Sequence, residues 1–409
     1  MRLAFITNLY PPYVIGGNEL LCDEVVTALR ARGHAVSVLC GRGRDLPARA
    51  DLLGGLEVDL DRKDQTFLGG RLPSPWEAFK LHLFSPSSFR TTRRWLRDLD
   101  PEVVVVWNLY MASMAPLLAA RRSGLPVVVH VCDKWLYHGL HDLRPLLRPV
   151  VRWKRAALTL ARHCVQPWLR LLARPRRVIA ISHFMKRTYV EAGFAADTID
   201  VIHLGIPTRD FAAAPRRARQ TGDPLKLLFV GSLWEGKGPQ TAVRALGRLR
   251  RAGTRAHLDV CGEGTAHFTD FLRGVIAEEG VTSDVTLHGR VDRDQVRGLC
   301  QSRDVLVFPS QWDEPFAAVP VEAMSTGMAV VATTAGGTPE AIVDGETGLL
   351  VPPGDPAALA QALGRLAQDD GLRLRLGTRA AQVAREQFDF GSYVDALEAC
   401  YQECLAVAR

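Results

Sequence analysis

The feature that most constrains the fold of this chain is an alternation of short apolar runs with amphipathic helical patterns. The runs are rich in valine and isoleucine, and they include "RLAFIT" (2–7), "EVVVVW" (102–107) and "PVVVHV" (126–131). A strand made almost entirely of apolar residues must be covered on both faces, which is typical of parallel sheets built from βαβ units. The sequence therefore predicts an α/β protein with parallel sheets.

The alternation occurs twice, on either side of a segment with a different composition. Residues 207–224 are rich in Ala, Arg, Pro and Gly and have little apolar periodicity, so we expect a linker there. Residues 1–206 and 225–388 are expected to form two Rossmann-like domains whose sheets face a central crevice. Further strands are expected at 35–40, 177–182, 198–206, 225–231, 256–262, 284–289, 304–310, 329–333 and 348–352, and a helix at 19–34.

Length and composition bound the class of protein. The chain has 409 residues, of which 47% are hydrophobic and 23% charged, with a formal net charge of +7. These values are ordinary for a globular protein of two or three domains. There is no long uninterrupted apolar run and no convincing signal peptide, so we expect a cytoplasmic location. The eight cysteines form no C-x-x-C pair and are expected to be free thiols.

A glycine-containing loop follows the first strand of each half. "PPYVIGGNE" (11–19) carries Gly16 and Gly17, which let the backbone approach a phosphate at the N-terminus of the next helix. It lacks the third glycine of GxGxxG, and an ordinary tight turn is the alternative. "VGSLWEGKG" (230–238) carries Lys237, which could neutralise a pyrophosphate without a metal. The alternative there is a solvated loop lysine.

Small residues follow two more strands of the second half, in "GEGT" (262–265) and "GRV" (289–291). Such residues leave room for a flat base or a ribose at the end of a strand. Plain turns explain each of these segments equally well.

Two carboxylates stand eight positions apart in the apolar stretch "EPFAAVPVEAM" (314–324). Pro315 favours an extended Glu314, which should lie in the loop after the strand. Pro320 suits the first turn of a helix, so we expect Glu322 in that first turn. Carboxylates accept hydrogen bonds from the paired hydroxyls of sugars. Stabilisation of the helix dipole is the alternative for Glu322, but it does not explain Glu314.

Taken together, these motifs resemble those of the retaining glycosyltransferases of the GT-B fold, which include bacterial mannosyl- and glucosyltransferases and sucrose synthase. The chain is similar to the family-4 type, with its Glu–seven residues–Glu motif, over nearly its whole length. The blocks that carry the resemblance are "YPPYVIGGNE", "VGSLWEGKG", "LHGRVDRDQV", "FPSQWDEPFAAVPVEAM" and "GGTPEAIVDGETGLLVPPGDPAALAQAL". The resemblance also implies that a C-terminal helix, 389–409, returns to the first domain.

The resemblance implies a role for each motif in binding a nucleotide sugar. Glu314 would approach the hydroxyls of the donor sugar, and Glu322 would hold the ribose hydroxyls. Lys237 would bind the pyrophosphate, together with the loop of Gly16 and Gly17. The remaining positions implied are the backbone of Phe316, Ala317 and Ala318 at the sugar, and Arg290 and Val291 along the base.

The chain departs from the family pattern at three places. Ser232 stands where many members have an arginine at the phosphates, and Ala317 stands where a glycine is usual. The family's His-Asp pair corresponds to "HVCDKW", in which Asp133 matches. The histidine position falls at either His130 or Cys132, and a helper role in catalysis is implied for His130 and Asp133.

The predicted function is retaining, metal-independent transfer of a sugar from a nucleoside diphosphate donor to an acceptor hydroxyl. A lipid-linked or polysaccharide acceptor of the cell envelope is expected, with no cofactor beyond the donor and no nucleic acid as partner. The alternatives are a nucleotide-sugar epimerase of the same fold and an inactive nucleotide-sugar-binding protein. The missing GxGxxG argues against a nicotinamide-dependent oxidoreductase.

A basic segment, 144–177, contains no acidic residue. Arg144, Arg148, Arg152 and Arg155 recur in it at helical spacing. One interpretation is a solvated pair of helices on the first domain. The other is a peripheral contact with anionic lipid on the inner face of the membrane, which would suit a lipid-linked acceptor.

Overall fold

The computed structural model describes residues 1–14, 16–41, 49–58, 84–110, 112–140, 168, 171–172, 174–211, 216–220 and 222–408. The chain divides into two compact units. Unit 1 comprises Met1–Ile181, Met185–Ile202 and Val394–Arg409, and unit 2 comprises Ser182–Phe184 and His203–Tyr393. Nearly all of the basic segment 144–177 lies outside the described residues.

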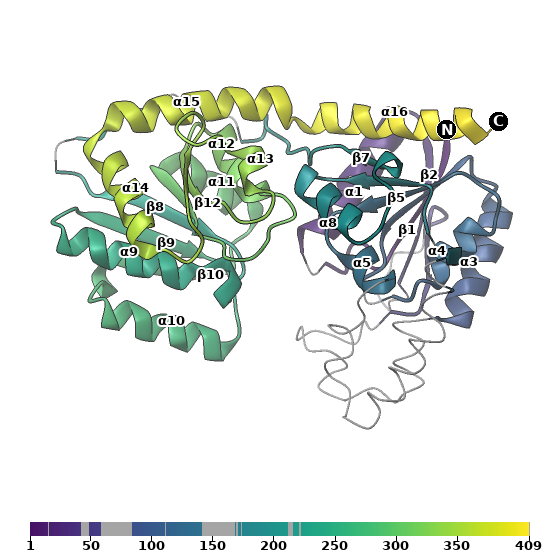
Figure 1. Ribbon diagram of the computed structural model, residues 1–409, viewed down its shortest axis with the longest axis horizontal. Helices are drawn as coiled ribbons and strands as arrows, with labels where there is room; N and C mark the ends of the chain where they lie inside the picture. Colours follow the sequence, from purple (N-terminus) through teal and green to yellow (C-terminus); the bar gives the residue numbers. More distant parts are fainter. Residues whose placement is uncertain are drawn as a thin grey trace. The chain divides into compact units, whose positions relative to one another are not determined.

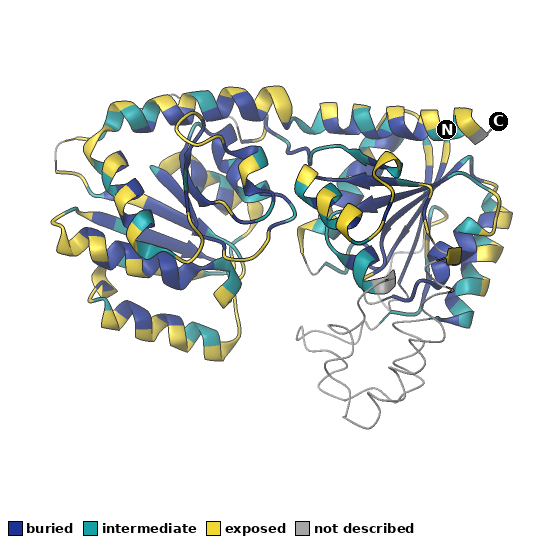
Figure 2. Ribbon diagram, viewed as in Figure 1, coloured by how far each residue is buried: buried dark blue, intermediate teal, exposed yellow. Residues whose placement is uncertain are grey.

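Unit 1 is built on a seven-stranded sheet in the order β3-β2-β1-β4-β5-β6-β7, in which every pair of neighbours is parallel. The strands are β1 (Arg2–Thr7), β2 (Ala35–Gly41), β3 (Leu52–Leu56), β4 (Val103–Asn108), β5 (Val127–Val131), β6 (Arg177–Ala180) and β7 (Ile199–Val201). Every residue of β4 and β5 is buried, as their continuous apolar sequences predict (Figure 2).

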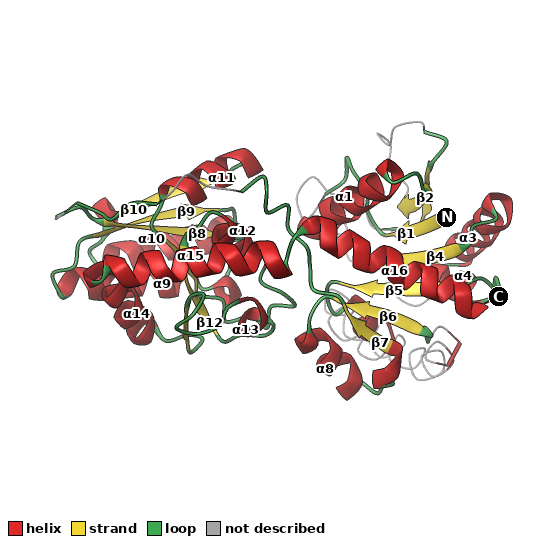
Figure 3. Cartoon of the chain, turned by 90° about the horizontal axis from the view of Figure 1, so that it is seen from above, coloured by secondary structure: helices red, strands yellow, loops and turns green. Residues whose placement is uncertain are grey.

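The helices of unit 1 are α1 (Gly17–Ala31), α3 (Pro86–Leu99), α4 (Ala115–Arg121), α5 (Trp135–Leu140), most of α8 (His183–Glu191) and, from Val394, α16 (Phe390–Ala408). A short 3-10 helix, η2 (Ala196–Thr198), precedes β7. Figure 3 shows the C-terminal part of α16 over the strands of this unit. Tyr401 is fully buried there, edge-on to Phe5 of β1 at 6.3 Å between ring centroids. Arg177 forms an ion pair of 2.7 Å with Glu403. The end of the chain is therefore an integral part of the unit that contains its beginning.

Unit 2 is built on a six-stranded parallel sheet in the order β10-β9-β8-β11-β12-β13 (Figure 1). Its strands are β8 (Leu225–Val230), β9 (Ala256–Cys261), β10 (Val285–Gly289), β11 (Val305–Phe308), β12 (Ala329–Thr333) and β13 (Leu349–Val351). Its helices are α9 (Pro239–Arg251), α10 (Ala266–Glu278), α11 (Arg293–Ser302), α12 (Ala318–Ser325), α13 (Thr338–Ala341), α14 (Pro356–Gln368) and α15 (Asp370–Gln387), with 3-10 turns η3 (Glu235–Lys237) and η4 (Thr282–Asp284).

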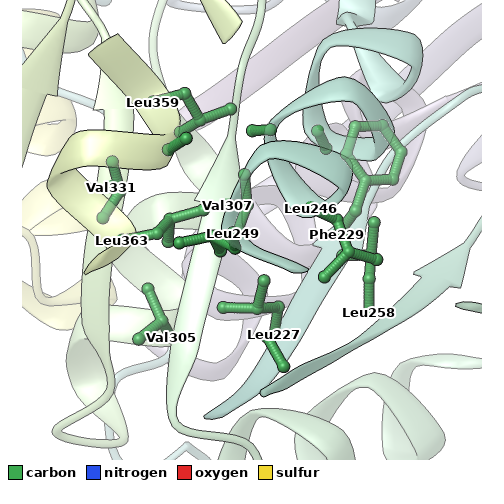
Figure 4. Close-up of a cluster of buried hydrophobic side chains, with 14 of the residues drawn as sticks. Leu227, Phe229, Leu246, Leu249, Leu258, Val305, Val307, Val331, Leu359 and Leu363 are labelled. Carbon is green, nitrogen blue, oxygen red and sulfur yellow. The ribbon is translucent and has the colours of Figure 1, made fainter. Parts of the chain in front are cut away.

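The core of unit 2 lies between one face of this sheet and the helices α9, α10 and α14. Alternate strand residues such as Leu227, Phe229 and Val307 point into it, against Leu246 of α9 and Leu363 of α14 (Figure 4). Each of these side chains is almost completely buried, which stabilises the fold by about 1.5–3 kcal/mol per large apolar side chain. The strand-end loops are thus carried on a well-packed scaffold.

The predicted fold class is confirmed: both units are parallel-sheet α/β structures. The structure corrects the details at two strands. β3 was not predicted, because its sequence "LLGGL" contains two glycines and lacks β-branched residues. The strand expected over 198–206 is wrong beyond Val201, because β7 is an edge strand and the chain passes to unit 2 at His203. Within the described residues, no helix is long and apolar enough to span a membrane.

Candidate functional site

Both sheets reverse their strand order beside their first strand. The reversal falls between β1 and β4 in unit 1, and between β8 and β11 in unit 2. At such a switch point the loops leaving the carboxyl ends of the two strands diverge, and ligands of parallel α/β sheets bind there. Lys237 follows β8 and Glu314 follows β11, so the residues predicted from separate motifs meet at the switch point of unit 2.

Lys237 and Glu314 form an ion pair with 2.7 Å between Nζ and Oε1. Glu314 is only 5% exposed, and the hydroxyl of Ser310 donates to the same carboxylate oxygen over 2.7 Å. The ammonium of Lys237 also lies 5.9 Å from the ring centroid of Phe308. A buried carboxylate is costly unless it is paired and hydrogen-bonded, so this lysine stabilises the charge on Glu314.

The lysine loop is fixed to the loop that follows β11. The carbonyl of Gly236 accepts hydrogen bonds from the amides of Gln311 at 2.7 Å and Trp312 at 3.0 Å. Gly238 has a φ of 73°, and a Cβ atom there would collide with the carbonyl of Pro309. Glycine is therefore required beside Lys237 by both backbone conformation and close packing. In "EGKG", Gly238 therefore has a structural role, and Lys237 is the candidate for a chemical role.

The loop of Glu314 is supported from behind by a glycine pair to which the sequence analysis assigned no role. The amide of Gly337 donates to the carbonyl of Glu314 over 2.7 Å. Gly336 has a φ of 60°, and a Cβ atom on it would collide with the backbone of Glu314. The backbone then continues through buried Phe316 and Ala317 to Ala318, the first residue of α12.

Glu322 was predicted to lie in the first turn of its helix, and this is wrong. α12 begins at Ala318, so Pro320 is its third residue and Glu322 its fifth. The first amides of a helix have no partner within the helix, and therefore Pro320 does not prevent the helix from starting before it. Glu322 lies 3.6 Å from the guanidinium of Arg293, the first residue of α11.

The "GRV" segment leads directly into α11, so the contact between Arg293 and Glu322 places the second carboxylate beside this segment. Arg290 is exposed and Val291 is half-buried. Ser232, where a family arginine was expected, is exposed just after β8. The residues predicted to bind the base and the ribose, and Lys237 at the pyrophosphate, therefore lie in loops at the carboxyl ends of the strands of unit 2 or in the helices that these loops begin. Gly16 and Gly17, predicted at the same pyrophosphate, lie in unit 1.

Gly17 begins α1 at the switch point of unit 1, and Gly16 is the N-cap residue before it. Both are exposed, and a Cβ atom added to either would meet no other atom within 4 Å. The packing of the protein itself therefore does not require glycine at these positions. The amide of Gly16 donates over 2.8 Å to the carboxylate of Glu19, a buried acid in the first turn. A carboxylate there is stabilised by the free amides of the helix N-terminus.

His130 and Asp133 lie at the end of β5 in the same unit. The imidazole of His130 is fully buried and stacks on Trp107 at 4.0 Å between ring centroids, with Nδ1 3.2 Å from the Cys132 thiol. Burial lowers the pKa of His130 to about 3, so the ring is neutral. The sequence contained no signal for this stacking, because it depends on the pairing of β4 with β5.

Asp133 accepts a hydrogen bond of 2.7 Å from the amide of Trp135. Burial raises the pKa of Asp133 to about 6, and the charge of Glu19 acts in the same direction. Trp107, which stacks on His130, also donates from Nε1 to Oδ1 of Asn18 over 2.9 Å, and this contact places the first turn of α1 near the end of β5. Unit 1 therefore brings the predicted glycine loop and the predicted acid to one edge of its sheet.

Comparisons with known proteins agree with this architecture. The family model for glycosyltransferases group 1 matches residues 210–383, and the model for glycosyltransferase family 4 matches residues 15–210. Glycogen synthase of Mycobacterium tuberculosis is 30% identical over 415 residues, covering 98% of this chain and 94% of that protein. The D-inositol 3-phosphate glycosyltransferase of Acidothermus cellulolyticus is 29% identical, covering 96% of this chain and 87% of that one.

Solved structures share the fold at low sequence identity. Sucrose-phosphate synthase of Thermosynechococcus elongatus superposes with a TM-score of 0.72 at 18% identity, covering 99% of each chain. Anabaena Alr3699/HepE in complex with UDP superposes with a TM-score of 0.70 at 19% identity, covering 98% of this chain and all of that one. The chain belongs to the GT-B-fold glycosyltransferases, in the group 1 and family 4 class.

Proposed function

We propose that this glycosyltransferase moves a sugar from a nucleoside diphosphate donor to an acceptor hydroxyl, with retention of the anomeric configuration and without a divalent metal. The observation that carries the proposal is the buried Glu314, paired with Lys237 at the switch point of unit 2. This site presents one cation and one acid side by side, as a donor with a diphosphate and a sugar requires. The UDP and UDP-glucose complexes of Anabaena Alr3699/HepE, which shares the fold, support a nucleotide-sugar donor.

In the proposed reaction the bond between the anomeric carbon and the diphosphate oxygen breaks, and a bond to the acceptor oxygen forms on the same face. The negative charge on the leaving diphosphate grows toward the transition state, where Lys237 stabilises it most. The amides beside Gly16 and Gly17 are proposed to bind the same phosphates. Glu314 accepts hydrogen bonds from the sugar hydroxyls, and the acceptor proton passes to the departing phosphate oxygen.

Glu322 is proposed to accept hydrogen bonds from the ribose hydroxyls, with Arg290 and Val291 along the base. Its contact with Arg293 holds the carboxylate beside the "GRV" segment. Asp133 and His130 are proposed to act at the acceptor side. Because His130 is fully buried and neutral, we assign it the positioning of the Cys132–Asp133 segment rather than contact with the substrate.

The acceptor is proposed to be a polysaccharide or a lipid-linked intermediate of the cell envelope. The names of the relatives, glycogen synthase and D-inositol 3-phosphate glycosyltransferase, support a sugar or polyol acceptor. We propose a cytoplasmic enzyme whose basic segment 144–177 contacts anionic lipid. Co-sedimentation with anionic liposomes at low salt, lost at high salt, tests the contact. Protein that stays in the supernatant at low salt would exclude it.

The experiment that tests the main proposal has two stages. Thermal shifts with a panel of UDP-, GDP-, ADP- and TDP-sugars identify the donor, because a ligand that binds the folded state raises the melting temperature. Proton NMR of the early product of that donor and an acceptor then reads the coupling at the anomeric carbon. We expect the configuration of the donor, and an inverted product would overturn the proposal.

An inactive nucleotide-sugar-binding protein is the second candidate, and Ser232 is the observation that favours it. The exposed serine replaces an expected arginine, so a single predicted cation, Lys237, remains at this loop. Donor binding without any transfer or donor hydrolysis would favour this candidate. An epimerase would instead convert the donor sugar in the absence of an acceptor.

A further inference from the structure

Three potential metal ligands lie together outside the proposed reaction centre. His183, His203 and Glu340 each offer one ligand atom, and these atoms all lie within 4.8 Å of one another. His183 begins α8, His203 follows β7, and Glu340 is on α13. Three segments that are far apart in the sequence therefore converge in unit 2.

The carboxylate of Glu340 is already held in place. Its two oxygens accept hydrogen bonds of 2.6 Å from the amides of His183 and Phe184. Oxygen Oε2 also lies 3.0 Å from Nε2 of His203. In a tetrahedral zinc site with bonds of about 2.0–2.2 Å, two ligand atoms are about 3.3 Å apart, so His203 and Glu340 already have nearly that separation.

The third ligand has the freedom to complete the set. The imidazole of His183 is exposed, and its ring centroid lies 5.5 Å from that of His203. A side-chain rotation of an exposed histidine costs little compared with the formation of a metal–nitrogen bond. His203 by contrast packs against the rings of Phe316 and Phe388, each with its centroid 5.9 Å away.

We infer that His183, His203 and Glu340 form a binding site for a Zn²⁺-class divalent cation. Two imidazoles and one carboxylate are a known zinc-binding set, with water in the fourth position. The ion takes the place of the hydrogen between Nε2 of His203 and Oε2 of Glu340, and the ring hydrogen of His203 then resides on Nδ1. His203 and Glu340 are therefore preformed ligands, and His183 closes on the ion. The carboxylate keeps its backbone hydrogen bonds, which orient it as outer-sphere contacts orient metal ligands.

The site adjoins the loop that carries Glu314. His203 contacts the ring of Phe316, two residues after Glu314. The hydroxyl of Ser182 donates to the carbonyl of Pro315 over 2.5 Å. Glu340 follows the glycine pair that packs on the backbone of Glu314. A bound ion therefore cross-links the segments that border this loop, and its ligands do not include Lys237 or Glu314.

The test is zinc titration of the full chain in competition with a chromophoric chelator. Before the titration, EDTA removes bound metal from the protein, and the EDTA is then removed. We expect the wild type to bind one zinc per chain. The dissociation constant for zinc should rise by about tenfold or more in each of the single variants His183→Ala and His203→Ala, since even the loss of an outer-sphere partner lowers metal affinity by about 10–100-fold. His257→Ala is the matched control, because His257 is a histidine of the same unit whose Nε2 contacts Thr286 instead. It should bind zinc as the wild type does.

His183→Ala is expected to fold, because it removes an exposed side chain and leaves the backbone amide that donates to Glu340. A loss of zinc binding in this variant is therefore not a result of unfolding. A circular dichroism melt verifies that each variant is folded. X-ray absorption of the zinc-loaded wild type should show nitrogen and oxygen ligands with two imidazoles. Wild-type affinity in His183→Ala and His203→Ala, or sulfur in the first shell, would overturn the inference.

Discussion

The two sheets have the same kind of switch point, but the charged groups at the carboxyl ends of their strands behave in opposite ways. At unit 2 the lysine and carboxylate are paired as ions, 2.7 Å apart. At unit 1, burial favours the neutral forms, since it lowers the pKa of His130 to about 3 and raises that of Asp133 to about 6. A site of paired ions suits a charged diphosphate, whereas unit 1 holds a neutral imidazole and an acid that ionises only near pH 6. The comparison predicts that charge removal impairs catalysis most in unit 2, and that pH acts most visibly through unit 1.

The largest effect is expected from Lys237→Ala. Loss of the cation proposed to stabilise the leaving diphosphate should lower kcat by about 100- to 1,000-fold, with a smaller change in donor affinity. Initial rates over a range of donor concentrations separate the two. The exposed Lys226, on β8 of the same unit, provides the matched control, and Lys226→Ala should retain wild-type rates.

Lys237→Ala also leaves the buried carboxylate of Glu314 without its ion pair, which can cost several kcal/mol of stability. Lys237→Ala combined with Glu314→Gln removes both charges, so it should recover stability without recovering the rate. If turnover of Lys237→Ala is normal and only KM rises, the lysine binds ground state and transition state equally. The proposed role at the leaving group would then be wrong.

The next effect concerns Glu322→Ala. If Glu322 accepts hydrogen bonds from the ribose, its removal should weaken donor binding by roughly 10- to 100-fold, because hydrogen bonds to a charged group are worth about 1.5–3 kcal/mol. Isothermal titration calorimetry with the donor measures this directly. Arg293→Ala removes the other member of the 3.6 Å pair. Equal losses in both variants would mean that Glu322 only holds α11 in place.

Asp133→Asn tests the charge behaviour of unit 1. Burial raises the folded-state pKa of Asp133 to about 6, above its usual value near 3.8. The folded state therefore favours the protonated acid, and its stability falls as pH rises from about 4 to 6 and stays lower above that. Because asparagine does not ionise and retains the acceptor for Trp135, the variant should gain about 2 kcal/mol at pH 7.5 and nothing near pH 4. Urea midpoints at both pH values measure this.

Glu340→Gln provides the opposite case in unit 2. Burial alone would raise the pKa of Glu340, but the hydrogen bonds from His203 and from the amides of His183 and Phe184 lower it. The ionised carboxylate of Glu340 therefore stabilises the folded state at neutral pH, and this stabilisation is lost as pH falls below the usual pKa range of a glutamate. Glu340→Gln should accordingly be less stable than the wild type at pH 7.5. If the urea midpoints of Asp133→Asn and Glu340→Gln change in the same direction at pH 7.5, the proposed contrast between the two units is wrong.

The sequence predicted those features that have a local signal. Runs of valine and isoleucine marked the central strands, and "EGKG" and "EPF" marked Lys237 and Glu314 because their backbone requirements involve adjacent glycines and prolines. The contact between the two residues follows from the strand order, since β8 and β11 are neighbours only in the folded sheet. A family resemblance was needed to connect the motifs.

The features that were missed depend on tertiary packing. β3 is short and glycine-containing, so edge pairing with β2 determines it more than its own propensity does. His183, His203 and Glu340 are separated by up to 157 positions in the chain and have no characteristic spacing. The stacking of His130 on Trp107 likewise arises only when β4 pairs with β5.

The smallest effect is expected from removal of divalent cations, which should leave the transfer rate unchanged. Asp292 and Asp294, which follow β10, are of the residue type that binds divalent metals, but both carboxylates have partners within α11. Asp292 caps α11 by accepting the amide of Gln295 at 2.8 Å, and Asp294 lies 3.0 Å from Arg297. In the proposed reaction, Lys237 supplies the positive charge that a metal would otherwise provide at the diphosphate.

Transfer rates should therefore agree between protein treated with EDTA and protein supplied with excess Mg²⁺. Inhibition by EDTA that Mg²⁺ reverses would contradict metal-free transfer in unit 2. A second outcome is inhibition of the wild type that only Zn²⁺ reverses. If His183→Ala has the rate of the inhibited wild type and EDTA does not lower it further, the effect lies at the cluster of His183, His203 and Glu340. If EDTA changes the transfer rate of neither the wild type nor His183→Ala, Lys237 remains the proposed cation of the reaction. Any bound zinc would then affect only stability and zinc binding itself.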